Sequence, residues 1–241
     1  MADCSIVILT YNALEYTKMC YESIVKYTKI PYEIIFVDNC SSDGTRNFLN
    51  TLKLPNVKCF FNNSNLGFAK GCNQGASAAS GNALLFLNND TVVTKNWLNN
   101  LISCLNSHPQ IAAVVPVSNL AAGSQIPVAY KSTKEMEVFA CHFNKINPSK
   151  WRPTDVASGF CFLIKKPVFQ LLGGFDEQFE NGFFEDTDLV LRIRRAGYRV
   201  MIAGDTFVHH FGSRTFRANN LNIDHWMHIN ATKFTNKHFS A

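Results

Sequence analysis

The first half of the chain alternates between short apolar runs and longer segments in which apolar residues recur every three or four positions. The short runs predict strands, and the longer segments predict helices. Strand and helix in turn indicate βαβ units with right-handed crossovers and a parallel sheet. The expected strands are 5–10, 32–37, 57–61, 83–87 and 111–115, and the expected helices are 14–27, 43–52, 68–79 and 96–105.

The second half of the chain is less regular. Residues 118–154 carry Gly123, Pro127, Pro148 and Pro153 with weak periodicity, which predicts a loop-rich excursion over one face of the sheet. The last thirty residues show no clear pattern. The remaining segments predict strands at 160–164, 200–203 and 207–210 and helices at 167–172 and 184–196.

Composition and charge exclude several classes of protein. The chain has 241 residues, of which 46% are hydrophobic and 17% charged, as in a globular protein of one large α/β domain or two small ones. A net charge of +5 is too mild to indicate nucleic acid, but it suits an anionic ligand such as a nucleotide. No apolar stretch approaches the roughly 18 residues of a membrane span, and the first residues do not resemble a secretory signal.

The eight cysteines are scattered without a C-x-x-C pair, and several lie inside apolar runs. Buried, reduced thiols explain this pattern better than disulfides or a zinc site. The sequence therefore predicts a cytoplasmic protein. Twenty phenylalanines further predict that the core or a ligand cleft is aromatic.

Polar residues gather where four predicted strands end. Because parallel strands share a carboxyl edge, where α/β sheets bind ligands, we expect these side chains to lie along one edge. Oxygen donors there suit a hard divalent cation bridging to a phosphate, whereas a plain polar turn is the alternative. The four groups are Thr10-Tyr11-Asn12, Asp38-Asn39, Asn62-Asn63 and Asn88-Asn89-Asp90.

Two further features of the first half leave two interpretations each. Asp38 could bind a nucleobase or a ribose hydroxyl, or it could close an Asx turn, although a turn or cap explains Asp43 better. Gly67, Gly71 and Gly75 fall on one face of a helix, where each glycine costs roughly 1 kcal/mol against alanine. Either close packing of the helix on the sheet or a ligand at its amino terminus would account for them.

Three carboxylates, Glu185, Asp186 and Asp188, occupy the first turn of the helix expected at 184–196. The helix dipole alone favours this placement, and Asp188 can pair with Arg192 four residues later. Glu185 and Asp186 repel one another and follow two phenylalanines, so partial burial would raise a carboxyl pKa toward that of a useful base.

A nucleotide at the predicted edge would need a metal ion, because the chain contains neither G-x-G-x-x-G nor a P-loop motif. Asp90 would hold the metal. Strand alternation directs His209 and His210 to opposite faces, so at most one of them faces a cleft. That histidine is either a structural residue or an additional metal ligand.

Together these segments resemble the family 2 glycosyltransferases of the GT-A fold, most closely the bacterial polysaccharide and protein-glycosylating branch that contains rhamnosyltransferases. The resemblance spans residues 5 to about 215, and the motifs occur in family order. They are Ile-Val-Ile-Leu-Thr-Tyr-Asn, Val-Asp-Asn-Cys-Ser-Ser-Asp-Gly-Thr, Asn-Leu-Gly-Phe-Ala-Lys-Gly-Cys-Asn-Gln-Gly, Leu-Phe-Leu-Asn-Asn-Asp-Thr, Gly-Gly-Phe-Asp-Glu-Gln-Phe, Phe-Glu-Asp-Thr-Asp-Leu with Arg-Arg-Ala-Gly-Tyr, and Val-His-His-Phe-Gly-Ser.

The resemblance implies a single GT-A domain over 1–241, with a mostly parallel central sheet, helices on both faces and a small second sheet in the C-terminal half. Residues 1–117 would bind the nucleotide-sugar, 118–215 would carry the acceptor and catalytic half, and 216–241 would form a tail. It also implies an inverting, hexosyltransferase-type reaction that uses Mn²⁺ or Mg²⁺. A sugar would move from a UDP- or dTDP-linked donor to a hydroxyl of a glycan, a lipid-linked glycan or a glycoprotein.

Site residues follow from the resemblance by position. Asp90 would bind the metal together with His210 or His209, and Asp186 would be the catalytic base with Glu185 beside it. The first aspartate of the family's D-x-D motif is Asn88 here, which leaves one carboxylate at that place. The nucleotide-sugar would contact Thr10, Tyr11, Asn12, Asp38, Asn39, Asn65, Gly67, Phe68, Lys70, Asn73, Asn88 and Asn89.

Two other functions remain open from the sequence. One is a catalytically silent sugar- or partner-binding domain of a larger glycosylation protein, which Asn88 would suit. The other is a nucleotidyltransferase, although the chain lacks a glycine- and arginine-rich phosphate loop near the first strand. We expect no nucleic-acid partner and no membrane span, whereas peripheral association with the inner face of the membrane and the oligomeric state are left open.

Overall fold

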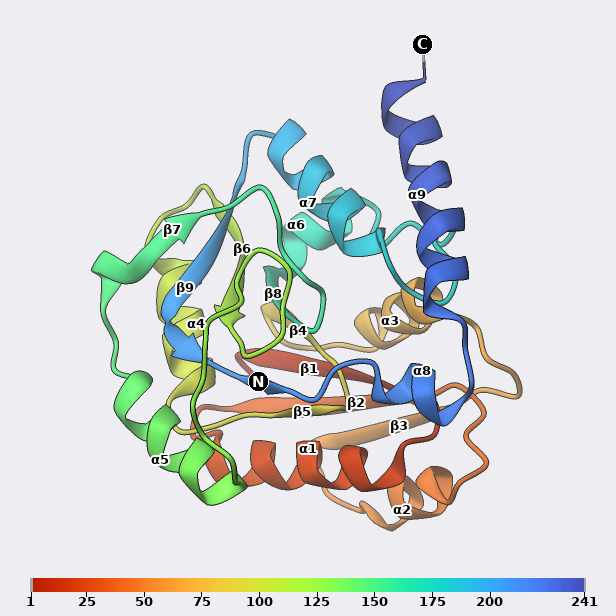
Figure 1. Cartoon of the computed structure of the whole chain (residues 1–241), viewed down its shortest axis with the longest axis horizontal. Helices are drawn as coiled ribbons and strands as arrows, with labels where there is room; N and C mark the ends of the chain where they lie inside the picture. Colours follow the sequence, from red (N-terminus) through yellow and green to blue (C-terminus); the bar gives the residue numbers. More distant parts are fainter. Residues whose placement is uncertain (1, 241) are drawn as a thin grey trace.

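A twisted central sheet dominates the computed structural model, which describes residues 2–240 (Figure 1). Its eight strands lie in the order β3-β2-β1-β4-β8-β6-β9-β7. The pairs β3-β2, β2-β1, β1-β4 and β6-β9 are parallel, whereas β8 is antiparallel to both neighbours and β7 is antiparallel to β9. The strands are β1 (Cys4–Thr10), β2 (Tyr32–Asp38), β3 (Val57–Phe61), β4 (Ala83–Leu87), β6 (Ile111–Val117), β7 (Trp151–Pro153), β8 (Cys161–Lys165) and β9 (Arg199–Phe207).

A second, small sheet pairs β5 (Thr91–Val92) with β10 (His209–His210) in antiparallel register. It joins the end of β4, through residues 88–90, to the segment that follows β9. The expected fold class, a mostly parallel sheet with a small second sheet, is therefore confirmed. The two short strands expected at 200–203 and 207–210 are instead the single strand β9 and the separate strand β10.

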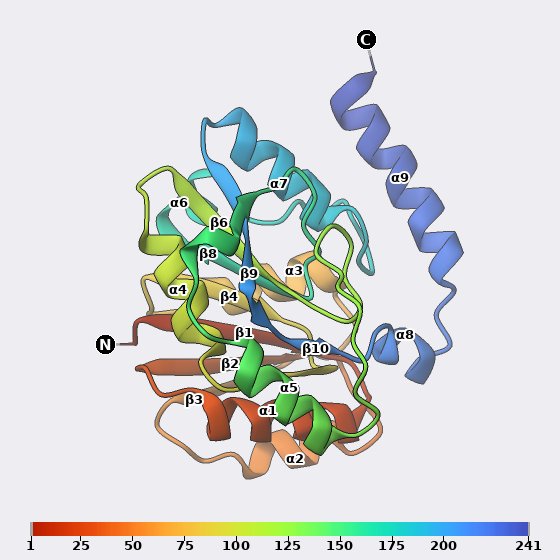
Figure 2. The same ribbon diagram turned by 60° about the vertical axis from the view of Figure 1, so that its left-hand side comes forward.

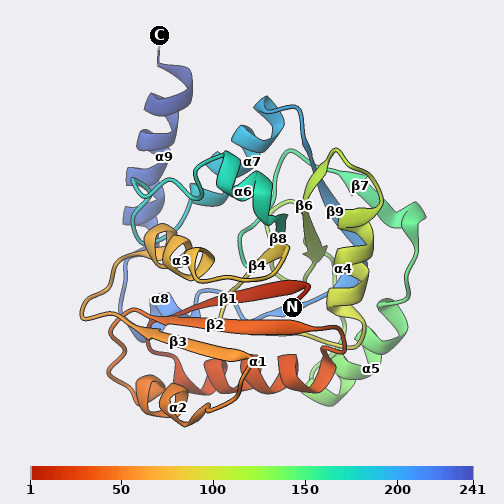
Figure 3. The same cartoon turned by 180° about the vertical axis from the view of Figure 1, so that it is seen from behind.

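Helices cover both faces of the central sheet (Figure 3). One face packs against α3, α6 and α7, and the other packs against α1, α2 and α4. No helix in residues 2–240 is long and apolar enough to cross a membrane. The helices are α1 (Leu14–Tyr27), α2 (Thr45–Thr51), α3 (Phe68–Ser77), α4 (Trp97–Asn106), α5 (Thr133–Phe143), the 3-10 turn η1 (Pro148–Lys150), α6 (Lys166–Leu171), α7 (Glu185–Arg195), α8 (Arg214–Ala218) and α9 (Ile223–Phe239).

The glycines of α3 separate into two roles. A Cβ atom on Gly75 would lie 2.5 Å from Cγ1 of Val7, and one on Gly71 would collide with Leu9. These two glycines therefore allow α3 to pack directly on β1, as the packing interpretation expects. Gly67 is the N-cap residue with φ of 81°, and it lies at the edge of the cavity described below.

Two segments with weak or no sequence pattern contain helices that were not predicted. Residues 118–154 contain α5 and β7, and α5 is capped by Ser132, whose hydroxyl accepts a hydrogen bond from the Glu135 N–H. The last thirty residues contain α8 and α9, and Figure 2 shows α9 standing beside the body of the protein. The sequence did not reveal these helices because α5 buries only Met136 and Ala140, and α9 buries only Asn230. Such helices lack the wide apolar stripe on which periodicity depends.

All eight cysteines are free thiols, as expected, and five of them are buried. Burial raises the pKa of Cys20 and Cys104 to about 12 and keeps these thiols protonated.

Candidate active site

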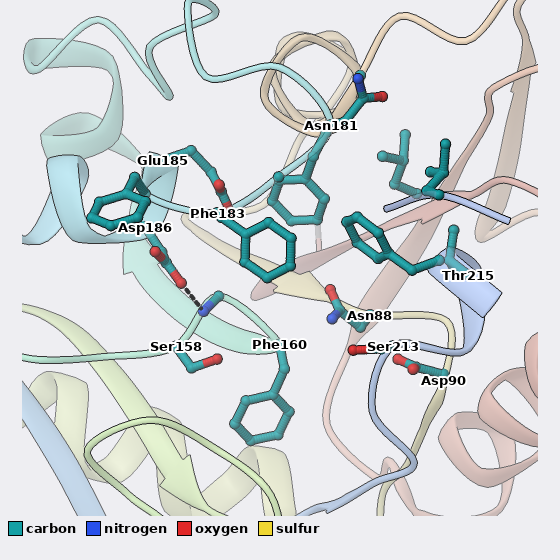
Figure 4. A pocket seen from close by; sticks show the side chains of 18 of the residues that line it. Asn88, Asp90, Ser158, Phe160, Asn181, Phe183, Glu185, Asp186, Ser213 and Thr215 are labelled. Carbon is teal, nitrogen blue, oxygen red and sulfur yellow. Dashed lines mark hydrogen bonds between the residues drawn. The ribbon is translucent and has the colours of Figure 1, made fainter. Parts of the chain in front are cut away.

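A cavity of about 480 Å³ opens at the carboxyl edge of β1, β2 and β4 (Figure 4). Its wall combines the ends of these strands with the loop before α7 and the segment around α8. Most of the surface is apolar, and polar groups are concentrated at a few places, as in many small-molecule sites. Of the residues expected at the site, the lining includes Tyr11, Asn39, Asn65, Gly67, Phe68, Asn88, Asn89, Asp90, Glu185, Asp186 and His210.

Thr10 and Asp38 lie fully buried beneath this wall. The Thr10 hydroxyl donates to Oδ1 of Asp38 (2.9 Å), and the Ser41 N–H donates to Oδ2 (3.0 Å). Both carboxylate oxygens therefore have partners within the protein. The Ser41 contact closes the turn after β2, which is the Asx-type interpretation of Asp38.

Three other expected nucleotide contacts also lie outside the cavity wall. Oδ1 of Asn12 accepts the Ser42 N–H (2.7 Å) and so fixes the turn that precedes α2. Nδ2 of Asn73 donates to the Phe175 carbonyl (2.9 Å), which ties α3 to the loop after α6. Lys70 is exposed on α3. The structure therefore gives Asn12 and Asn73 roles in holding loops and does not bring Lys70 to the cavity.

Asp90 and His210 form a close polar pair in the cavity wall. Oδ1 of Asp90 lies 3.2 Å from Nε2 of His210, and Oδ2 accepts the Arg214 N–H (3.1 Å). The His210 ring stacks on Phe160, and its Nδ1 lies 3.0 Å from the Leu120 carbonyl oxygen. A proton on Nδ1 would satisfy that carbonyl and leave the Nε2 lone pair facing Asp90, which is how metal-binding histidines are commonly oriented.

The surroundings of Oδ1 of Asp90 and Nε2 of His210 favour positive charge. Nε2 of His210 is buried without a hydrogen-bond partner. Burial alone would lower the pKa of His210, but the Asp90 carboxylate 3.2 Å away raises it above its usual value. A divalent cation fits this donor pair, although no cluster of three His, Cys, Asp or Glu side chains suited to a metal occurs within residues 2–240. Further ligands would have to come from amides, water or a bound diphosphate.

His209 points away from Asp90, as strand alternation predicts. Its Nδ1 forms a 2.6 Å hydrogen bond with the Tyr130 hydroxyl, and burial lowers its pKa to about 4. His209 does not line the cavity, so only His210 of the two candidate histidines reaches the site.

The two carboxylates at the start of α7 have different surroundings. Oδ2 of Asp186 accepts the Gly159 N–H (2.8 Å), a bond drawn in Figure 4, and Oδ1 accepts the Thr187 N–H (2.7 Å). Glu185 is only 4% exposed, and its Oε2 has no partner. Burial raises the pKa of both groups, further for Glu185 because Asp186 is its neighbour. The sequence-based expectation of a raised carboxyl pKa is confirmed in direction.

Asp188 is a structural residue, as its pairing with Arg192 predicts. The Arg192 guanidinium donates to the buried Asp188 carboxylate (2.7 Å). Lys237 and His238 of α9 reach the same carboxylate at 2.5 and 2.7 Å. The end of α9 is therefore fastened to the helix that carries Glu185 and Asp186.

Sequence reasoning missed the part of the wall that comes from the unpatterned C-terminal segment. Ser213, Thr215, Phe216, Leu221 and Met227 all line the cavity. Short α8 and the largely polar packing of α9 give no periodic signal. The only signal in the sequence is the presence of aromatic and aliphatic residues, such as Phe216, Leu221 and Met227, among polar ones. Residues of this kind indicate that the segment packs against the rest of the protein.

Comparison with known proteins agrees with this architecture. The sequence model of "Glycosyl transferase family 2" matches residues 5–173. The N-acetylglucosaminyl-diphospho-decaprenol L-rhamnosyltransferase of Mycobacterium tuberculosis is 25% identical over 240 residues, covering 88% of this chain and 77% of that protein. Human polypeptide N-acetylgalactosaminyltransferase 14 is 26% identical over 183 residues, covering 70% of this chain but only 33% of that protein.

Solved structures share the fold. A mannosyltransferase from Pyrobaculum calidifontis, in complex with GDP-Man and Mn²⁺, superposes with a TM-score of 0.65 at 20% identity over 86% of this chain and 56% of that one. GalNAc-T7 with UDP, GalNAc and Mn²⁺ gives a TM-score of 0.71 at 17% identity over 100% of this chain and 52% of that one. This chain therefore spans only about half the length of these two structures, and the likeness extends to the fold alone.

Proposed function

The chain belongs to glycosyl transferase family 2, and from that premise we propose that it is an inverting glycosyltransferase that uses a nucleotide-sugar donor and a divalent cation. The donor would be UDP- or dTDP-linked, and the acceptor would be a hydroxyl of a glycan, a lipid-linked glycan or a glycoprotein. One observation carries the proposal. A single cavity contains both a cation-favouring pair, Asp90 and His210, and a base candidate of raised pKa, Asp186.

In this mechanism Asp186 accepts the proton of the acceptor hydroxyl as that oxygen attacks the anomeric carbon. The Gly159 and Thr187 N–H groups hold the carboxylate in place while the proton transfers. Attack from the side opposite the diphosphate inverts the anomeric configuration. A divalent cation bound by Asp90 and His210 would neutralise charge on the diphosphate leaving group.

The remaining residues of the cavity would bind and orient the substrates. Tyr11, Asn39 and Asn65 come from the ends of β1 and β2 and from the loop before α3, where the nucleoside would lie. Asp38 supports this end from below, because its carboxylate accepts the Thr10 hydroxyl and the Ser41 N–H. The relative from M. tuberculosis is named for a lipid-linked acceptor, which supports a lipid-linked glycan as one acceptor and cytoplasmic action at the inner face of the membrane.

A silent binding domain is the second candidate, because Asn88 replaces one carboxylate of the metal motif. Hydrolysis of donors by the purified protein separates the two functions. We expect slow, chelator-sensitive release of nucleoside diphosphate from at least one of a panel of UDP-, dTDP- and GDP-sugars. Metal-dependent binding of a donor without hydrolysis or transfer would instead establish the silent domain.

A further inference from the structure

Two partly exposed aromatic rings project into the cavity. Phe183 precedes α7, Phe216 lies in α8, and their ring centroids are 5.1 Å apart at an interplanar angle of 46°. Figure 4 shows the Phe183 ring between the carboxylates of Glu185 and Asp186 on one side and Asn88 and Asp90 on the other. Phe183 therefore lies where a substrate would pass between the proposed base and the proposed cation site.

The backbone that presents Phe183 is strained. Residues 181–184 all have positive φ, with values of 55°, 92°, 70° and 73°. Only Gly182 among them adopts this region without a steric cost, and each of the others costs about 1–3 kcal/mol. Such strain persists only where the surroundings hold it in place.

Contacts from α9 hold this loop. Nδ2 of the buried Asn230 donates to the carbonyls of Glu180 (2.9 Å) and Gly182 (2.8 Å). The Phe184 ring, which also lines the cavity, packs on Phe234 of α9 with ring centroids 5.5 Å apart. The fold thus maintains a costly conformation whose result is an aromatic ring exposed in the cavity and not buried in the core.

We propose that Phe183 and Phe216 form a stacking platform for a pyranose ring of a substrate. Aromatic faces carry negative charge density, and the axial C–H groups of a pyranose, polarised by neighbouring oxygens, carry positive charge. Stacking would bury the apolar face of the sugar and leave its hydroxyls at the ring edge, where Asn88, Asn181 and Thr215 also line the cavity. The inference rests on the proposed function, because it assumes that the cavity binds a sugar substrate.

The stacked pyranose could belong to the donor or to the acceptor, and kinetics distinguishes them. We compare Phe183→Leu, which keeps apolar volume but removes the aromatic face, with Phe183→Tyr, which keeps that face. Phe183→Leu should raise the KM for the stacked sugar about 3- to 10-fold, and Phe183→Tyr should stay within about twofold of the wild type. A rise in donor KM during hydrolysis without acceptor identifies the donor sugar, and a rise confined to acceptor KM identifies the acceptor. Phe239→Leu, at a side chain on α9 that is 67% exposed, is the matched control.

A spectroscopic measurement makes the test independent of turnover. NMR titrations that observe the sugar protons use UDP-glucose and dTDP-rhamnose as donor probes. Methyl glycosides of glucose and N-acetylglucosamine serve as acceptor probes. Pyranose C–H protons of at least one probe should shift upfield on binding to the wild type and to Phe183→Tyr, but not on binding to Phe183→Leu.

Two results would overturn the stacking platform. In the first, UDP or dTDP without a sugar loses as much affinity in Phe183→Leu as the nucleotide-sugar does, which would make the pair a nucleobase platform. In the second, no probe shows an upfield shift that depends on Phe183. Either result leaves the proposed function standing if the wild type still hydrolyses a donor in a chelator-sensitive way, so the two failures are distinguishable.

Discussion

Glu185 and Asp186 are neighbours in the sequence, but their oxygen atoms have different partners. Two backbone N–H groups hold Asp186 at the cavity wall, whereas Oε2 of Glu185 is buried without a partner. Several hydrogen bonds to the charged form offset part of the burial cost for Asp186, and fewer such bonds compensate Glu185. Asp186 is therefore the better base, and Glu185 is the more costly residue to ionise.

Replacement of Asp186 by asparagine should abolish proton acceptance without unfolding the protein, because the amide fills the same space. We expect kcat for transfer to fall at least about 100-fold while the KM for the donor changes little. Steady-state kinetics with circular dichroism as a folding check would measure this. Transfer within about tenfold of the wild type would remove Asp186 from the role of base.

In the wild type, kcat should fall as the pH drops through the raised pKa of Asp186, which lies above the ordinary range of aspartate.

Glu185 should make the stability of the protein depend on pH. Because burial raises its pKa in the folded state, its favourable contribution is present below the unfolded pKa of about 4.3 and is lost as the pH rises through the folded pKa. Glu185→Gln does not titrate, so the variant should gain stability relative to the wild type as the pH increases from 4 to 8. Urea unfolding at several pH values measures the difference, and a constant difference would contradict the raised pKa.

For single residues, the sequence predicted the site best where a polar side chain directly follows a buried strand. The order of polar strand ends placed Asn39, Asn88, Asn89 and Asp90 in one cavity, because parallel strands share their carboxyl edge. It did not distinguish side chains that reach the cavity from those, such as Asp38, that bond within the turn beneath it. That distinction depends on side-chain direction, which spacing along the chain does not determine.

Among the elements, α3 shows how a helix can approach a sheet through its glycines. Gly75→Ala would place a methyl group 2.5 Å from Cγ1 of Val7 and 3.2 Å from Cγ2 of Val37, two stiff β-branched side chains. The expected overpacking cost of about 1–3 kcal/mol exceeds the gain in helix propensity of roughly 1 kcal/mol. Chemical denaturation should show net destabilisation, whereas Ser77→Ala, on the exposed side of the same helix, should change stability by less than about 0.5 kcal/mol. A more stable Gly75→Ala variant would show that α3 can move away from β1.

Helix α9 acts on the site through Asn230. Asn230→Ala leaves the Glu180 and Gly182 carbonyls without their donor, which should destabilise the protein by about 1–3 kcal/mol. The loop at 181–184 would relax. We therefore expect kcat to decrease even at a temperature at which the variant is fully folded. His228→Ala, at an exposed position of the same helix, is the control. Unchanged kcat in a folded Asn230→Ala variant would show that Asn230 of α9 does not influence catalysis.

The elements that sequence reasoning predicted and those that it missed differ in how they are stabilised. Strands β1, β2, β4, β6 and β8 and helices α1, α3, α4 and α7 bury broad apolar surfaces, and their apolar patterns revealed them. Helix α9 is attached by side-chain hydrogen bonds and ion pairs to partners about fifty residues away, such as Lys237 to Asp188. Contacts of this kind depend on the tertiary fold and leave no local pattern.

For the whole molecule, both halves of the chain contribute to one cavity, so a ligand that bridges them should stabilise the protein as a unit. A thermal-shift screen of UDP-, dTDP- and GDP-sugars, with and without Mn²⁺, should give its largest shift when donor and metal are present together. Binding stabilises the folded state by about 2.7 kcal/mol at a ligand concentration a hundredfold above Kd. Equal shifts with and without Mn²⁺ would contradict a metal site at Asp90 and His210.

The dependence of the 181–184 loop on Asn230 also sets an order of events during synthesis. The ribosome makes the strands and the carboxylates of α7 first, and the amide that holds the loop follows about fifty residues later. Until residue 230 has left the exit tunnel, the strained loop has no partner for its carbonyls. A nascent chain can therefore fold its sheet before Asn230 reaches the loop, and we expect the wall between the proposed base and the proposed cation site to be completed only after that contact forms.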